Sequence, residues 1–293
     1  MSRGDAATVV TAAVLRDWPL PASRGDKDSR GRALIVGGSV PNPGGVLLAA
    51  RAAMRAGAGK TQLVVPAPVA VALAVALPES LVRGAPCSPE GNLTEEAAAA
   101  VAEYADGADA TLLGPGMLDV GSAVEVVAGV AHLLSGPVVM DALALAWLTE
   151  DPSRGRRFDS LILSPNLAEL ALTLGEDEQE VAGDPASAVL RLAEATGAVV
   201  SSGSTSTFIG TPDGRLWRSD EGNAGLGVAG SGDVKAGITV GLCARGAEPA
   251  QAAVWAAHLH GAVGGRLASR FGPTGYLAGE LPAEIPQTLL EIG

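Results

Sequence analysis

Gly225-Leu226-Gly227-Val228-Ala229-Gly230-Ser231-Gly232-Asp233 is the stretch from which the fold of this 293-residue chain can be worked out. Its glycines let the backbone approach a ligand closely, and residues 234–242 have the apolar spacing of a buried helix. The loop therefore ends at a helix N-terminus, where unpaired amide N–H groups and the helix dipole favour an anion such as phosphate. Asp233 is predicted either to cap this helix or to face the ligand.

The rest of the chain alternates between short apolar runs and longer helical segments. Runs typical of buried strands lie at 33–36, 62–65, 110–113, 137–140, 161–163 and 198–201. Helices are expected at 46–56, 67–76, 95–104, 122–134, 168–174, 185–196 and about 247–271. The turn Pro212-Asp213-Gly214 joins two further strands, 207–209 and 216–217, into a hairpin. The pattern predicts an α/β fold with a central, mostly parallel sheet, helices on both faces and a short antiparallel edge.

Two segments of different character are expected. Residues 1–30 are polar apart from a short helix near 11–16, and they are predicted to form an N-terminal extension that packs on the body through Trp18-Pro19. Residues 31–293 contain no linker, repeat or low-complexity tract, and are predicted to be a single domain. Ligands of such sheets bind beyond the C-terminal ends of the strands, where this chain has Gly-rich turns.

The composition limits the classes of partner. A net charge of −12 argues against a nucleic-acid surface, because such surfaces neutralise phosphates with Lys and Arg. No apolar segment follows Met1-Ser2-Arg3-Gly4-Asp5, and no window is long enough to span a membrane, so a cytoplasmic protein without membrane contact is expected. Cys87 and Cys243 lack metal-site spacing and are expected to be reduced.

Two short motifs are discounted. Residues 225–230 spell G-x-G-x-x-G, but a dinucleotide fingerprint directly follows the first buried strand, and this one lies late in the chain. Gly59-Lys60-Thr61 matches the end of a Walker A loop, yet Met54 stands where its first glycine belongs. His258 and His260 are two residues apart on a helix, so they point to different faces and are expected to be structural or surface residues.

The loop in its full context resembles the C-terminal signature of ribokinase-like enzymes. More narrowly, it is similar to the ADP- or ATP-dependent NAD(P)H-hydrate dehydratases. Other blocks occur in that family's order from about Arg30 onward: Arg30-Gly31-Arg32, residues 34–39, Pro43-Gly44-Gly45, Arg55-Ala56-Gly57-Ala58-Gly59, Gly114-Pro115-Gly116, residues 138–142, and Ser164-Pro165-Asn166 with Glu169. Each block alone is weak, but several blocks in order indicate membership of the family.

The resemblance implies a homo-oligomeric enzyme that repairs hydrated NAD(P)H, written NAD(P)HX. Such enzymes phosphorylate the ring hydroxyl from ATP or ADP, with Mg²⁺, and loss of phosphate then restores the double bond. By resemblance Asp233 is the catalytic base, and the substrate pocket comprises Gly45, Gly116, Asn166 and Asp233. The nucleotide is expected against Ser202, Gly203, Ser204, Thr205, Ser206, Gly230, Ser231 and Gly232. The sequence contains no visible cluster of metal ligands.

Three positions depart from the family's usual pattern. Asn166 replaces a histidine, Ser202 replaces a lysine, and Leu143 replaces a second aspartate. A kinase of another small hydroxylated substrate and a nucleotide-binding paralogue without activity therefore remain alternatives. Another cation in place of the missing lysine, such as Lys235 or an arginine, would favour activity, whereas Asn166 and Ser202 turned away from the cleft would favour the paralogue.

Overall fold

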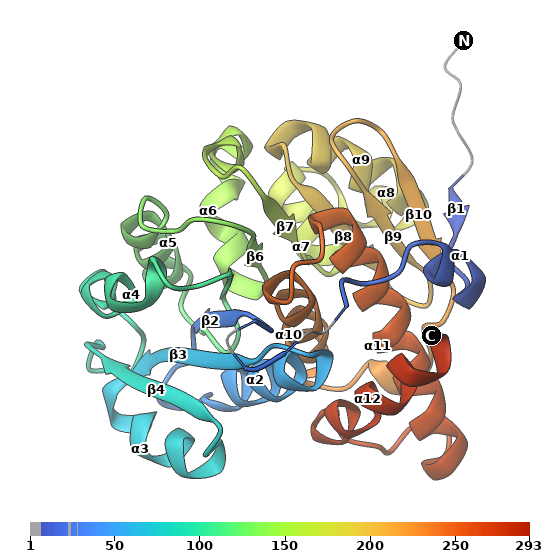
Figure 1. The fold of residues 1–293 in the computed structure, drawn as a ribbon. Coiled ribbons are helices and arrows are strands. Elements are labelled where there is room, and N and C mark those ends of the chain that lie inside the picture. Colours follow the sequence, from blue (N-terminus) through green and yellow to red (C-terminus); the bar gives the residue numbers. More distant parts are fainter. Residues whose placement is uncertain (1–6, 23–24, 28) are drawn as a thin grey trace.

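One ten-stranded sheet organises the computed structural model, which describes residues 7–22, 25–27 and 29–293 (Figure 1). From one edge to the other, its strands are β1 (Thr8–Val9), β10 (Leu216–Ser219), β9 (Thr207–Gly210), β8 (Val199–Gly203), β7 (Leu161–Leu163), β6 (Val138–Met140), β5 (Ala110–Leu113), β2 (Arg32–Val36), β3 (Lys60–Pro66) and β4 (Ser80–Ala85). The strands from β8 to β4 are parallel, whereas β9 is antiparallel to β8 and β10. The predicted mostly parallel sheet with an antiparallel edge is confirmed.

Helices cover both faces of the sheet because successive strand residues point to opposite sides. On one face, Ile35 belongs to a core with α1 (Ala12–Asp17), α2 (Gly44–Ala56), α3 (Ala67–Ala76), α10 (Ser231–Ala244), α11 (Pro249–Phe271) and α12 (Leu281–Ile292). On the other face, Leu34 and Val36 belong to a core with α4 (Ala97–Ala105), α5 (Val120–Val130), α6 (Ala146–Thr149), α7 (Leu167–Leu174), α8 (Glu178–Gly183) and α9 (Pro185–Thr196). Short 3-10 helices lie at Ala142–Leu145, Pro152–Arg157, Ala224–Leu226 and Ala278–Glu280.

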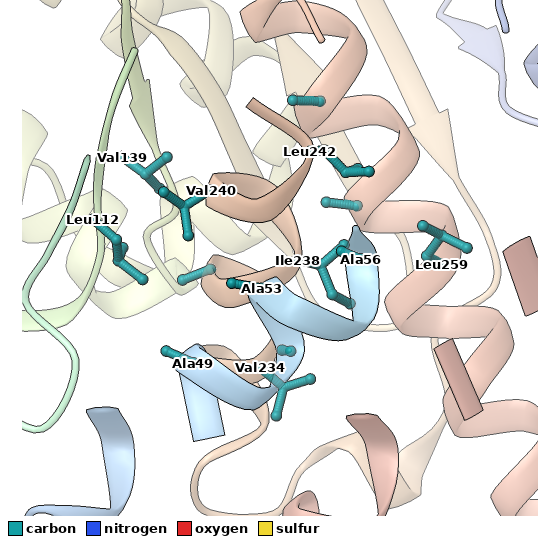
Figure 2. Packing of buried hydrophobic residues seen from close by; sticks show 14 of the residues in the cluster. Ala49, Ala53, Ala56, Leu112, Val139, Val234, Ile238, Val240, Leu242 and Leu259 are labelled. Atoms are coloured by element: carbon teal, nitrogen blue, oxygen red, sulfur yellow. The ribbon is translucent and has the colours of Figure 1, made fainter. Parts of the chain in front are cut away.

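Helix α10 lies between α2 and α11 and is in backbone contact with α2 (Figure 1). A Cβ atom on Gly237 would lie 2.3 Å from the carbonyl oxygen of Ala49, and one on Gly241 would lie 2.5 Å from that of Ala53. Figure 2 shows Ala49 and Ala53 of α2 against α10, with Val240 turned toward the sheet. Glycine at these positions therefore sets the distance between the two helices.

The chain before β2 contacts the C-terminal helices and the edge hairpin. The ring of Trp18 stacks on that of Trp217 with 5.8 Å between centroids, and its carbonyl oxygen accepts a hydrogen bond of 2.9 Å from Trp255 Nε1. Strand β1 adds to the sheet beside β10. The described part of the chain contains no helix long and apolar enough to cross a membrane.

Acidic residues mark the start of one short helix. In the acidic run 176–180, α8 begins at Glu178. Asp177 caps it by accepting hydrogen bonds from the backbone amides of Gln179 and Glu180. Acidic side chains in the first turn also favour the helix dipole, so a cluster that reads as solvated surface is well suited to start a helix.

Candidate active site

A cleft of about 570 Å³ opens beyond the C-terminal ends of β6, β7 and β8. These ends share one edge of the sheet because the strands are parallel, which is where ligands of doubly wound folds bind. Five segments line the cleft. Three follow the strand ends: Asp141 and Ala142 after β6; Ser164, Pro165, Asn166 and Glu169 after β7; and Gly203, Ser204, Thr205 and Thr207 around the end of β8. The other two are a set of residues between 222 and 235, and Ala257, His260 and Gly261 of α11.

The first turn of α10 forms one wall of the cleft. Gly230 precedes the helix with a φ of +89°, and a Cβ there would lie 2.4 Å from Leu48 Cδ1, so both conformation and space require glycine. Gly232 and Asp233 follow in the first turn, where backbone amides lack acceptors within the helix. Asp233 makes no capping bond, so of the two predicted roles it takes the one in which it faces the cleft. The turn offers amide donors beside a carboxylate.

Gly45 and Gly116 lie directly behind Asp233. A Cβ on Gly45, at the start of α2, would lie 2.6 Å from the backbone nitrogen of Gly116 and 3.0 Å from Oδ1 of Asp233. Gly116 itself has a φ of +71°, and its Cβ would meet the carbonyl oxygen of Asn42 at 2.6 Å. Three residues far apart in the sequence are therefore brought together. Gly45 and Gly116 are buried and do not themselves line the cleft, so they pack behind the carboxylate.

Three carboxylates, those of Asp141, Glu169 and Asp233, line the same cleft. Burial, reinforced by the charge of Asp233, raises the pKa of Asp141 to about 7, although Lys235 opposes the shift. Burial and the charge of Glu169 raise the pKa of Asp233 to about 6. Both pKa values lie close to neutral pH, where a carboxylate can accept and return a proton, as expected of acid–base sites.

Backbone strain accompanies the carboxylate cluster. Ala142, which follows Asp141 and lines the cleft, has a φ of +51° and is the one non-glycine residue with positive φ in the described ranges. This conformation costs an alanine about 1 kcal/mol, and strain of this kind is concentrated at functional sites.

Replacement of Asp141 by asparagine is expected to stabilise the protein at pH 8 by about 2 kcal/mol. The folded-state pKa lies above the unfolded value, so the unfolded chain binds fewer protons than the folded one between about pH 4 and 7. The wild type thus loses stability as the pH rises through 7, and the neutral amide avoids that loss. Urea unfolding in Mg²⁺-free buffer at pH 5 and pH 8 measures the difference. An equal effect of the substitution at both pH values would contradict this account.

Only part of the segment 202–206, at the end of β8, lines the cleft. Gly203, Ser204 and Thr205 line the cleft. The side chain of Ser202 is fully buried, does not line the cleft, and its Oγ has no hydrogen-bond partner. Ser206 Oγ donates to Asp220 Oδ1 at 2.8 Å, also outside the lining. The nucleotide contacts expected of residues 202–206 remain predictions.

Asn166 lines the cleft but is also the N-cap of α7. Its Oδ1 accepts a 2.8 Å hydrogen bond from the amide of Glu169, and Glu169 Oε2 accepts one of 2.9 Å from the amide of Asn166. This capping box fixes the orientation of both side chains at the cleft. Asn166 therefore stays on the cleft wall, unlike the side chain of Ser202.

Two further residues of the cleft were not assigned to the site from the sequence: Lys235 was named only as a possible substitute cation, and His260 was not expected there. Lys235 lies two residues after Asp233, and its Nζ donates a 3.3 Å hydrogen bond to the carbonyl oxygen of Ser201. His260, expected to be structural, lines the cleft with Nε2 2.8 Å from Ser231 Oγ. Burial and the charge of Lys235 lower the pKa of His260 to about 3, so its imidazole is neutral at physiological pH.

No set of three or more His, Cys, Asp or Glu side chains in the described ranges is arranged to hold a metal ion. The lining of the cleft nevertheless holds three carboxylates against a single lysine in the described part of the chain. Mg²⁺ is usually held by one or two carboxylates together with substrate phosphates. The cleft thus suits a magnesium–nucleotide complex better than a metal held by the protein alone.

Comparison with known proteins gives consistent matches over nearly the whole chain. A family model described as NAD(P)H-hydrate dehydratase matches residues 33–287. An ADP-dependent (S)-NAD(P)H-hydrate dehydratase of Xanthomonas campestris is 41% identical over 98% of this chain and 97% of its own length. The crystal structure of an ADP/ATP-dependent NAD(P)H-hydrate dehydratase from Bacillus subtilis, co-crystallized with ATP/Mg²⁺, has a TM-score of 0.85 at 27% identity, covering 98% and 99% of the two chains. A ribokinase-like protein of Enterococcus faecalis shares the fold, with a TM-score of 0.82 at 19% identity over 100% of this chain and 98% of its own.

Proposed function

This chain belongs to the NAD(P)H-hydrate dehydratase family, and we propose that it converts NAD(P)HX to NAD(P)H with ADP or ATP as the phosphoryl donor. One observation carries the proposal from the structure. The carboxylate of Asp233 lies in the first turn of α10, beside amides that lack helical acceptors and within a cleft large enough for substrates. A base and an anion site are thus adjacent, as phosphoryl transfer to a hydroxyl requires.

In the first step, Asp233 accepts the proton of the ring hydroxyl. The hydroxyl oxygen then forms a bond to the terminal phosphorus of the nucleotide, and the bond between that phosphorus and the bridging oxygen breaks. The amides of Gly232 and Asp233 are placed to donate hydrogen bonds to the transferring group. Each well-placed donor contributes about 3 kcal/mol to such a transition state.

In the second step, the ring carbon–oxygen bond breaks and phosphate departs. The lone pair of the ring nitrogen assists the departure, and the neighbouring carbon then loses a proton to the departing phosphate, which restores the double bond. Little chemistry is required of the protein here. Gly45 packs closely behind Asp233, where a Cβ would lie 3.0 Å from Oδ1, so glycine at this position leaves the carboxylate in place. Substrate contacts of Gly45 and Gly116 remain predictions.

Mg²⁺, when bound, would neutralise charge on the phosphates. Asp141 and Glu169 are the residues that would hold it, since both carboxylates line the cleft and repel one another in its absence. The role of Asp141 and Glu169 is to position the nucleotide. A cytoplasmic location, expected from the sequence, and a homo-oligomeric state, implied by the resemblance, remain predictions.

The proposed activity is tested by incubating the protein with NADHX or NADPHX and either ADP or ATP. Recovery of absorbance in the NADH band, above boiled-protein and nucleotide-free controls, is the expected result. Comparison of the four substrate pairs identifies the preferred donor and cofactor. Binding of nucleotide without any recovery would contradict the proposal and favour a paralogue without activity, whereas phosphorylation of another alcohol would favour a kinase.

The dependence of the rate on pH is expected to show an acidic limb near pH 6. As a base, Asp233 must be ionised, and its pKa in the free protein is about 6, so kcat/KM should rise about tenfold from pH 5 to pH 7 and then level off. A pH profile of initial rates measures this limb. A rate that stays constant from pH 5 to pH 8 would argue against a titrating carboxylate as the base.

A further inference from the structure

Lys235 is the one lysine or arginine among the residues that line the cleft in the described part of the chain. It shares that lining with the carboxylates of Asp141, Glu169 and Asp233. This excess of carboxylates over cations matters because the proposed nucleotide substrate brings further negative charge into the same space. Without a cation from the protein, the cleft walls would repel the phosphates.

The ammonium group lies between the two segments that form the anion side of the cleft. Lys235 arises from α10, two residues beyond the amides of its first turn, and its Nζ reaches the carbonyl oxygen of Ser201 in β8 at 3.3 Å. The next residues of that strand lead to Gly203 and Ser204 on the cleft wall. The lysine therefore bridges the start of α10 and the end of β8.

Its surroundings hold the group in place without using all its donors. An ammonium has three N–H donors, and the contact with Ser201 uses one of them. Burial lowers the pKa of Lys235 below its usual value, and the charges of Asp141 and Glu169 oppose part of that shift. Two donors are left for an anion.

From this geometry we propose that Lys235 is the phosphate-binding cation of the cleft and holds the terminal phosphates of the nucleotide between α10 and the end of β8. The positive charge comes from α10 and not from β8, because the side chain of Ser202 near the end of β8 is uncharged, buried and outside the lining of the cleft. The inference rests on the proposed use of ADP or ATP. It assigns to Lys235 the nucleotide-side charge that the sequence lacks at residue 202.

The experiment compares Lys235→Met with Lys235→Arg, and with Lys60→Met as a matched control. Lys60 is the first residue of β3, so it lies at the N-terminal ends of the parallel strands, whereas the cleft lies beyond their C-terminal ends. Titration calorimetry gives the Kd for ADP, ATP and adenosine at two salt concentrations. Loss of a charge-assisted phosphate contact is expected to weaken ADP and ATP binding about 10- to 100-fold in Lys235→Met, with adenosine within about twofold of wild type. Lys235→Arg should retain most of the affinity, and Lys60→Met all of it.

The outcomes separate this inference from the proposed function. ADP binding by Lys235→Met within twofold of wild type would overturn the inference while leaving the dehydratase assay unaffected. Equal weakening of ADP and adenosine would also overturn it, because it would indicate a structural role. Conversely, a protein that binds ADP through Lys235 but never restores NADH would retain the inference and lose the proposed function.

A second measurement keeps the test decisive if Lys235→Met fails to fold. Wild-type protein is treated with an amine-acylating reagent, with ADP, with adenosine or without ligand, and modification of Lys235 is followed by mass spectrometry. ADP is expected to protect Lys235, and adenosine is not. Absence of protection by saturating ADP would overturn the inference.

Discussion

Replacement of Asp233 by asparagine is expected to slow the dehydration of NAD(P)HX about 1,000-fold, because the amide cannot accept the hydroxyl proton. The shape of the site should be preserved, since the two side chains have the same size and Asp233 makes no capping bond. ADP binding should change by less than about threefold, because the amides of the first turn remain available. Initial rates and calorimetric titration of ADP measure the two effects separately.

The control is Asp184→Asn, which changes the same residue type at the N-cap of α9, where asparagine is equally suitable. This variant should keep wild-type rates. Asp233→Asn should also lack the acidic limb near pH 6, in whatever activity remains. A variant that retains more than about a tenth of the wild-type rate would exclude Asp233 as the general base.

The sequence predicted the architecture because the strands are buried on both faces. Leu161–Leu163 is an uninterrupted apolar segment and Ala110–Leu113 is broken only by Thr111, and the structure places β7 and β5 at these bounds. The hairpin at β9 and β10 followed from a turn with Pro, Asp and Gly in succession. Strong local signals and the tertiary fold agree here.

Two elements, the edge strand β4 and the C-terminal helix α12, were not predicted, and each has a physical reason. Strand β4 is an edge strand in which partly buried and exposed positions alternate, and Leu81 is 53% exposed, so it lacks the continuous apolar run of its neighbours. Helix α12 contains Pro282 in its first turn and Pro286 in its interior, which argue locally against a helix. It forms because Leu281 and Ile285 are buried against the rest of the protein.

The site was predictable only in part. The Gly-rich loop and Asp233 could be recognised as a helix start, and the resemblance identified Gly45 and Gly116, which the structure places beside that carboxylate. Neither periodicity nor spacing indicates which face of α10 or α11 borders a cleft made by other elements. Lys235 and His260 could therefore be placed in the site only once the helices were packed against the sheet.

Substitution of Gly237 by alanine is expected to lower the free energy of unfolding by about 3 kcal/mol, at the upper end of the usual cost of overpacking. The added Cβ would lie 2.3 Å from the carbonyl oxygen and 2.7 Å from the Cα of Ala49, so two backbones must move apart. A flexible side chain could yield, but a helix backbone in a core cannot. Thermal unfolding should show a midpoint about 5 °C lower than that of wild type.

Gly265→Ala provides the matched control, because Gly265 lies within α11 and a Cβ there would meet no atom within 4 Å. That variant should be stabilised by up to about 0.8 kcal/mol, through helix propensity alone. Separation of α2 from α10 would also move Asp233 away from Gly45, so folded Gly237→Ala protein should lose activity while Gly265→Ala retains it. If both variants were equally stable, the contact between α2 and α10 would not determine the helix spacing. If Gly237→Ala were unstable but fully active, that spacing would not position the base.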